Sequence, residues 1–282
     1  MTDYINYNGK IVLNSAKALP VNNRCFRYGD GIFESIKVSR GEIVNAENHY
    51  KRLINSANTI KVTLPGNFSF SYFCDQIIKL AEKNEHAKAA RIRFSLFRDD
   101  DGFYKPISHK GLFLIESQKL QNTDFRLNQI GLNIGLFTKM YKYHNVLSSI
   151  KSCNALLYVL AATYAEESGF DDALIMNEQK HIVEATSSNI FIVKENTLKT
   201  PGVDQGCVDG TMRKTIIELA KDNGYHVKIG RITLSELKIS DELFLTNAIS
   251  GIKWVKTFFE NNYDNSTSTI LLKKLSEKLI SK

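Results

Sequence analysis

Lys151 is the first residue whose position suggests chemistry. It lies at the start of a largely apolar stretch, residues 152–168, that predicts a long helix closed by Gly169. The helix dipole favours cations at the opposite end, so the pKa of a lysine here is expected to fall toward that of a nucleophilic amine. A solvated lysine in the first helical turn is the ordinary alternative.

Glu184 is the second candidate. Strand alternation over residues 181–186 places it on one face with Ile182 and leaves Val183 and Ala185 on the other. Apolar residues then cover both faces, and a buried carboxylate needs a partner because its desolvation is costly. An edge strand with Glu184 in water is the alternative.

A glycine turn before a predicted helix, residues 212–223, is the third candidate. Gly206 and Gly210 lack the spacing of a nucleotide-binding phosphate loop, but they still open a helix. The backbone N–H groups of Thr211 and Met212 would form an anion cradle there, with the positive end of the helix dipole behind it. A plain turn and helix cap is the alternative.

Three arginines lie within or directly after one predicted strand, residues 90–97. Arg91 and Arg93 share a face, while Arg98 lies on the other face or just past the end. A solvated edge strand is the ordinary interpretation of this pattern.

Composition limits the class of protein that could carry these residues. The chain has 282 residues, 43% of them hydrophobic and 24% charged, which excludes disorder and coiled coil and predicts a soluble globular protein of two domains. Its net charge of +7 comes from scattered basic residues, which fits an anionic small molecule as well as nucleic acid. Neither the six histidines nor the four cysteines have metal-ligand spacing, so no metal is predicted.

No stretch of about 18 apolar residues could span a bilayer, and the N-terminus lacks a signal-peptide pattern. We therefore expect a cytoplasmic protein with no membrane partner.

Local patterns predict a mixed α and β chain. Hairpins are expected at residues 4–12 and 32–44, helices at 48–61, 72–83, 152–168, 212–223 and 269–280, and further strands at 90–97, 112–115, 131–137, 173–176, 181–185, 190–193 and 242–246. The polar run 117–124 indicates a linker. It predicts a smaller N-terminal domain, residues 1–118, and a larger C-terminal domain, residues 119–282, that carries Lys151.

In this order along the chain, the candidate amine, carboxylate and anion turn resemble those of the class IV (fold type IV) aminotransferases, which depend on pyridoxal 5'-phosphate. Six segments look like that family's: residues 27–34, 49–53, 150–154, 183–191, 210–213 and 245–252. The resemblance implies a two-domain α+β fold of the D-amino-acid aminotransferase type, and a homodimer.

The resemblance also implies roles for the site residues. Lys151 would hold the cofactor as a Schiff base and carry a proton between the substrate Cα and the cofactor. Glu184 would keep the pyridine nitrogen protonated. The phosphate would be held by Arg52, Thr211 and Met212, with Thr246 and Asn247 beside it, and the substrate would meet Phe33, Arg93, Arg98 and Ala248. Ala248 stands where many members carry Ser or Thr.

The reaction within this family is open from the sequence. We expect a transaminase that moves the amino group of a small amino acid to a 2-oxo acid. An aminodeoxychorismate lyase, which forms 4-aminobenzoate and pyruvate, is the alternative, and Ser35 could supply its hydroxyl. Leu156 stands where branched-chain members have a tyrosine, which favours the other groups. A noncatalytic anion-binding or nucleic-acid-binding protein is the remote alternative; with the family's activity, no nucleic-acid partner is expected.

Overall fold

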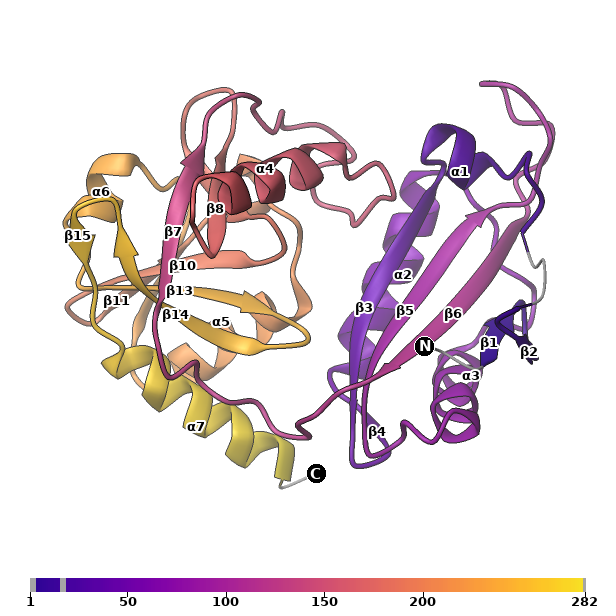
Figure 1. The fold of residues 1–282 in the computed structure, drawn as a ribbon, viewed down its shortest axis with the longest axis horizontal. Coiled ribbons are helices and arrows are strands. Elements are labelled where there is room, and N and C mark those ends of the chain that lie inside the picture. Colours follow the sequence, from indigo (N-terminus) through magenta and orange to yellow (C-terminus); the bar gives the residue numbers. More distant parts are fainter. Residues whose placement is uncertain (1–3, 16–18, 281–282) are drawn as a thin grey trace. The chain divides into compact units, whose positions relative to one another are not determined.

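The computed structural model describes residues 4–15 and 19–280, which form two compact units (Figure 1). Unit 1 comprises the described residues up to Asp124 together with Ile150–Asn154, and unit 2 comprises Phe125–Ser149 and the described residues from Ala155 onward. The sequence placed the boundary after residue 118. The residues that follow stay with unit 1, because the side chains of Lys37 and Ser39 bind the backbone carbonyls of Asn122 and Thr123.

Unit 1 is a six-stranded antiparallel sheet in the order β2-β1-β6-β5-β3-β4. Its strands are β1 (Tyr4–Tyr7), β2 (Lys10–Leu13), β3 (Gly31–Ser39), β4 (Glu42–Ile43), β5 (Ala89–Arg98) and β6 (Gly111–Lys119). Its helices are the short α1 (Arg24–Tyr28), α2 (Ala46–Thr59) and α3 (Phe70–Lys83). The predicted helices and hairpins of this unit are confirmed. Asn8 and Gly9 take the positive φ angles, 49° and 89°, that the first tight turn requires.

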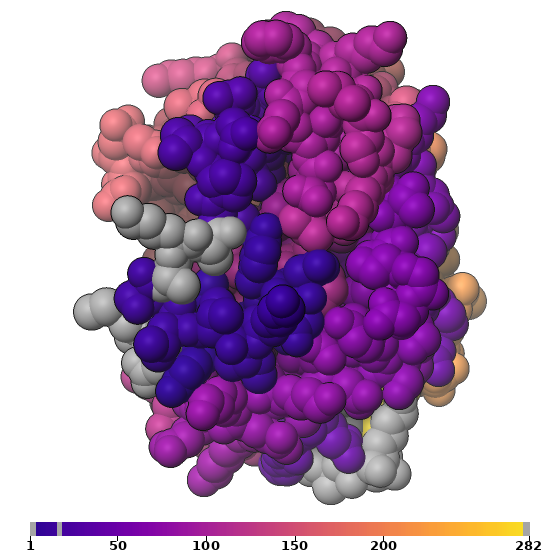
Figure 2. Space-filling view, turned by 90° about the vertical axis from the view of Figure 1, so that its right-hand side faces the viewer, coloured from indigo at the N-terminus to yellow at the C-terminus, as the bar shows by residue number. Residues whose placement is uncertain are grey.

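The core of unit 1 lies between the sheet and the two long helices. Ile92 and Phe94 of β5 are fully buried there with Leu53 of α2 and Phe73 of α3. The hairpin β1–β2 is tied to α3 by a hydrogen bond from Asn6 Nδ2 to Gln76 Oε1 (2.8 Å), and in the space-filling view it lies beside purple segments of this unit (Figure 2). The other sheet face therefore stays clear of these helices, and it carries Arg91 and Arg93 as the alternation predicted.

Unit 2 is built on a nine-stranded mixed sheet whose main path is β12-β11-β10-β13-β14-β7-β8-β9, with β15 paired to β14. Its strands are β7 (Leu132–Phe137), β8 (Asp172–Met176), β9 (Ile182–Ala185), β10 (Asn189–Lys194), β11 (Thr197–Thr200), β12 (His226–Ile229), β13 (Glu242–Asn247), β14 (Gly251–Phe258) and β15 (Asn261–Asn262). Its helices are α4 (Leu156–Glu167), α5 (Thr211–Asp222), α6 (Leu234–Lys238) and α7 (Ser266–Ile280), with a 3₁₀ turn at Val203–Gln205. Within the described residues, no helix is both long enough and apolar enough to cross a membrane.

Helix α4 corrects the predicted setting of Lys151. The helix begins at Leu156 and not at residue 152. The residues before it are extended and pair with β3: Lys151 O accepts from Phe33 N (2.9 Å), and Cys153 N donates to Gly31 O (2.9 Å). Lys151 thus belongs to a short strand-like segment of unit 1, and the predicted effect of the helix dipole on its amine does not apply.

Candidate active site

Lys151 is held against β3 in unit 1, with its amine over an aromatic ring. The Nζ atom lies 4.5 Å from the centre of the Phe33 ring. The backbone of this segment pairs with β3 at Lys151 itself and at Cys153, so the lysine's position is set by main-chain hydrogen bonds. A cation above a ring face is stabilised by the ring's quadrupole, which orients the side chain along the open face of the sheet.

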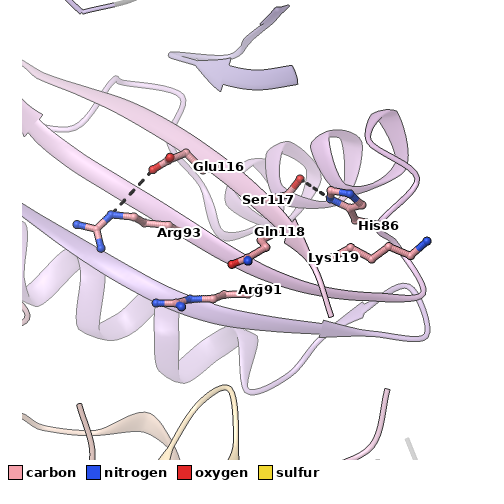
Figure 3. A pocket seen from close by; sticks show the side chains of 7 residues that line it. All are labelled: His86, Arg91, Arg93, Glu116, Ser117, Gln118 and Lys119. Carbon is pink, nitrogen blue, oxygen red and sulfur yellow. Dashed lines mark hydrogen bonds and ion pairs between the residues drawn. The ribbon is translucent and has the colours of Figure 1, made fainter. Parts of the chain in front are cut away.

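Arg93 contacts the same ring. Its guanidinium carbon is 3.8 Å from the centre of the Phe33 ring, and its Nε lies 4.0 Å from Glu116 Oε2. Arg93 also lines a groove of about 490 Å³ in unit 1 (Figure 3). The residues around this groove are His86, Arg91, Arg93, Glu116, Ser117, Gln118 and Lys119. Two of the predicted substrate residues, Phe33 and Arg93, therefore lie together with Lys151.

Arg52 is paired with a carboxylate that the sequence analysis did not assign. Its Nε and Nη2 bind Glu34 Oε1 and Oε2 at 2.8 and 2.5 Å, and His49 Nδ1 lies 2.7 Å from Glu34 Oε2. All three side chains are buried. Burial alone would raise the pKa of Glu34, but the charge and hydrogen bonds of Arg52, with His49, lower it to about 2. Burial lowers the pKa of His49, against the opposing effect of Glu34.

Arg98 has a structural role, which corrects its predicted contact with substrate. Its Nε binds Asp30 Oδ2 (2.9 Å), and its terminal nitrogens contact Asp30 Oδ1, the carbonyls of Ile60 and Lys61, and His109 Nδ1. Those contacts use all the N–H donors that a guanidinium has. Arg98 is also buried, because it ends β5 on the helix-covered face. It therefore fastens β5 to the end of α2 and has no donor left for a carboxylate.

Glu184 lies in β9 of unit 2 and has the partners that its burial requires. Its Oε1 accepts from Tyr158 OH (2.7 Å) and from Lys142 Nζ, and its Oε2 accepts from the backbone N–H of Val208 (2.9 Å). The side chain is 4% exposed. The buried interpretation of the strand pattern is thus confirmed. Burial is the main cause that raises the pKa of Tyr158, and the charge of Glu184 is the second. This phenol therefore stays a hydrogen-bond donor.

The predicted anion turn lies at the start of α5 in unit 2. The helix begins at Thr211, and its N-cap residue is Gly210, which has no side chain to cap it. The first N–H groups of a helix have no partner within the helix, and an anion can accept hydrogen bonds from them. Gly210 precedes Thr211, and a Cβ at this glycine would collide with Asn189 Oδ1.

Thr246 adds a hydroxyl to this turn. Its strand position is opposite Asn189, the residue that contacts Gly210. Thr246 is 1% exposed, and its Oγ1 is buried with no hydrogen-bond partner in the described part of the chain. A buried hydroxyl without a hydrogen-bond partner is costly unless a ligand satisfies it. These residues therefore fit a phosphate group.

The neighbouring Asn247 and Ala248 contribute less to such a site. Asn247 Oδ1 accepts from the N–H groups of Ile249 (3.0 Å) and Ser250 (2.8 Å), and its Nδ2 donates to Ser188 (3.0 Å). Its side chain thus builds the turn after β13. Ala248 lies in that turn and offers no polar side-chain atom to a phosphate.

Four partners of the predicted residues were not identified from the sequence: Glu34, His49, Lys142 and Tyr158. For Glu34 and His49 a signal existed, since strand alternation in β3 and the apolar stripe of α2 place both toward the core. Lys142 comes from an irregular loop, and nothing in its local pattern points to Glu184.

With this geometry in place, comparison with known proteins identifies the family. The sequence profile of amino-transferase class IV matches residues 31–258, a span that includes Lys151, Glu184 and the turn before α5. The chain belongs to the class IV aminotransferases, and it is an enzyme of that class, a transaminase. Enzymes of this class depend on pyridoxal 5'-phosphate.

Individual relatives carry two different names. A putative branched-chain-amino-acid aminotransferase of Methanocaldococcus jannaschii is 30% identical over 274 residues, 96% of this chain and 93% of that protein. An aminodeoxychorismate lyase of Vibrio harveyi is 27% identical over 236 residues, 83% of this chain and 85% of that protein. Both of the reactions weighed from the sequence are thus represented.

The fold is shared with solved members of the family. The branched-chain amino acid aminotransferase of Escherichia coli matches with a TM-score of 0.87 at 22% identity, over 98% of this chain and 93% of that one. This confirms the predicted α+β fold of type IV.

Proposed function

We propose that this transaminase uses pyridoxal 5'-phosphate, held by Lys151, to move the amino group of a small amino acid to a 2-oxo acid. When bound, the cofactor supplies an electron-accepting ring to the substrate's amino group. Family membership supports the reaction, and the unpartnered hydroxyl of Thr246 near the start of α5 is the observation that supports the cofactor.

Contacts within unit 1 support the roles proposed for its residues. Unit 1 would provide the Lys151 amine as the attachment point and as the base that takes the proton from the substrate Cα. Phe33 lies next to that amine, and Arg93, which contacts the same ring, would bind the substrate carboxylate through charge-assisted hydrogen bonds. Arg52, oriented by Glu34, would add a charge to the phosphate.

Unit 2 would provide the phosphate turn and the ring-nitrogen partner. Thr211, Met212 and Thr246 would hold the phosphate, with Asn247 shaping the adjoining turn. Glu184 would face the pyridine nitrogen, and Tyr158 and Val208 already fix its two oxygens in place. This arrangement leaves the carboxylate little freedom to turn away.

Replacing Thr246 by valine tests the phosphate site. The variant should bind pyridoxal 5'-phosphate more weakly by about 1–2 kcal/mol, the usual cost of removing a hydrogen bond to a charged group. Titrating the cofactor-free enzyme while following its visible absorbance measures the affinity. Pyridoxal, which has no phosphate, should bind both proteins alike, and Thr257→Val on β14 serves as a matched control. Equal weakening for both compounds would place Thr246 away from the phosphate.

Replacing Glu184 by glutamine tests the ring-nitrogen role. An amide cannot hold a pyridinium proton as a carboxylate does, so we expect Cα–H cleavage to slow by about a hundredfold. Single-turnover kinetics with Cα-deuterated substrate isolate that step. Lys142→Met is the control, because it removes the ion-pair partner and keeps the carboxylate. Unchanged cleavage in a folded Glu184→Gln enzyme would remove Glu184 from this role.

The lyase reaction is the second candidate, favoured by the Vibrio harveyi relative and by the pairing of Ser35 with Arg93 across β3 and β5. The two are separated by supplying the cofactor-loaded enzyme with L-glutamate, D-alanine, L-leucine and aminodeoxychorismate in turn. Formation of a 2-oxo acid, with its amino group passed to a second 2-oxo acid, supports the transaminase. Release of 4-aminobenzoate with no amino transfer from any amino acid supports the lyase.

We also propose a homodimer. Helix α4 leaves apolar side chains in water, namely Leu156, Val159 and Leu160, which are 63%, 57% and 42% exposed. Apolar surface of this kind favours association between subunits. Sedimentation equilibrium measures the mass directly, and a monomer at micromolar concentration would contradict the proposal.

A further inference from the structure

Two cysteines that are distant in the sequence meet in unit 1. Cys25 lies in α1, and Cys153 lies in the segment that pairs with β3. Both contact Gly31: Cys153 N donates to its carbonyl oxygen (2.9 Å), and a Cβ on Gly31 would lie 2.9 Å from Cys25 Sγ. The two thiols lie close enough for each to affect the pKa of the other. Both residues are partly accessible to solvent.

The charge of Arg93 acts on both sulfurs, and the amine of Lys151 also acts on Cys153 through its charge. The neighbouring thiol of Cys25 lowers the pKa of Cys153, burial opposes this, and the charge of Arg93 lowers it further. The same thiol contact and burial raise the pKa of Cys25. Cys153 is therefore the sulfur that is more readily deprotonated, and a thiolate is the reactive form of cysteine.

We propose that Cys25 and Cys153 are a peroxide-sensitive pair that forms a disulfide bond within unit 1. The Cys153 thiolate attacks an oxygen of hydrogen peroxide, the O–O bond breaks, and hydroxide leaves and takes up a proton to become water. Cys153 is then a sulfenic acid. The sulfur of Cys25 attacks that sulfur, the S–O bond breaks, and a second water leaves with the Cys25 proton. Two thiols have lost two electrons, and peroxide has been reduced to water.

The disulfide bond would act on the segment that carries Lys151. In the reduced protein this segment is fixed to β3 by backbone hydrogen bonds, and the charge of Arg93 acts on its Cys153 sulfur. Oxidation adds a covalent link to α1 and leaves Cys153 without a thiol that could become a thiolate beside Arg93. The inference concerns the thiols alone and goes beyond the proposed function.

The other two cysteines provide internal controls. Cys74 lies on α3, and burial raises its pKa. Burial as the main cause and the charge of Glu184 as the second raise the pKa of Cys207 to about 12. Both should therefore react slowly with peroxide.

Peroxide treatment with peptide mapping tests the proposal. The purified protein is reduced, freed of reductant, treated with a small excess of hydrogen peroxide at neutral pH, and blocked with N-ethylmaleimide. We expect the intact mass, measured before blocking, to fall by two hydrogens, and a nonreducing digest of the blocked protein to contain the Cys25 and Cys153 peptides joined by a bond that a dithiol cleaves. Cys74→Ser should behave like the parent chain. Cys25→Ser should stop at a Cys153 sulfenic acid, which dimedone traps.

Several results would overturn the proposal. These are unlinked Cys25 and Cys153 after oxidation, a link that involves Cys74 or a second chain, and loss of two hydrogens in Cys25→Ser. If the variants do not fold, alkylation rates of the unmodified protein still decide, because Cys153 should react with iodoacetamide about tenfold faster than Cys74. Equal rates would remove Cys153 as the attacking sulfur.

Discussion

Replacing Lys151 by alanine is expected to lower the rate of amino transfer by about four orders of magnitude while the chain remains folded. One residue would lose two roles, the covalent hold on the cofactor and the base for the Cα proton, and proton transfer alone contributes up to about 10⁴-fold. Half-reaction rates with excess L-glutamate measure the loss. Borohydride reduction of the loaded parent enzyme should place its phosphopyridoxyl label on this lysine.

Lys151→Arg is the matched control for this experiment. Arginine keeps a positive charge over the Phe33 ring, but it stays protonated at neutral pH and cannot supply a neutral amine. If the lysine acted only through that charge, the arginine variant would remain active. Substantial activity in Lys151→Arg, or a borohydride label on another lysine, would contradict the assignment.

Replacing Glu34 by alanine is expected to destabilise unit 1 by about 3–5 kcal/mol, because it leaves the buried Arg52 guanidinium without its partner. Hydrogen exchange of β3 and α2 measures this directly. The lone tryptophan, Trp254 in β14, provides a control, since its fluorescence reports on unit 2 and should change little. If exchange in β3 is unaffected, the ion pair is dispensable.

The same cluster predicts an acid dependence. The folded pKa of Glu34, about 2, lies below its usual value of 4.5, so the stabilisation is fully present above pH 4.5 and is lost as the pH falls toward 2. That difference corresponds to about 3 kcal/mol. The lowered pKa of His49 also makes the folded protein less stable as the pH falls, and this loss begins near the usual histidine pKa of 6.5. Urea unfolding from pH 7 to pH 3, followed by circular dichroism, measures the slope. Glu34→Gln should reduce the slope of the free energy of unfolding against pH at the acid end of this range. An unchanged slope would assign the dependence to other groups.

Local sequence patterns were sufficient to predict the helices and strands whose apolar residues recur with a clear helix or strand period. Helices α2, α3 and α5 and both hairpins of unit 1 lie within a few residues of where apolar stripes and the Asn8-Gly9 turn placed them. The short strands β11 and β12 were missed, because their four-residue runs alternate too briefly to stand out from a loop. The start of α4 was misplaced because a tertiary contact, the pairing of residues 150–154 with β3, overrides helix propensity there.

For the site, residue type and spacing predicted which side chains are buried but not which groups they bind. Burial of Glu184 followed from its strand, whereas Lys142 reaches it from a loop. Arg98 resembles the substrate arginine of D-amino-acid enzymes, and nothing local shows that Asp30 and two carbonyls at the end of α2 surround it. Contacts between residues far apart in sequence depend on the whole fold, so a single strand pattern cannot supply them.

The chain enters unit 1 twice, since Ile150–Asn154 belongs to it while the residues on either side belong to unit 2. A gene truncated after codon 124 would therefore encode an incomplete unit. The first residues of β3 would lose the strand that pairs with Gly31 and Phe33, and an uncovered strand edge recruits other chains. Supplying residues 150–154 as a separate synthetic peptide should restore that edge. Because this peptide is synthetic, it could carry a chemically altered amine at position 151 that ribosomal synthesis does not provide.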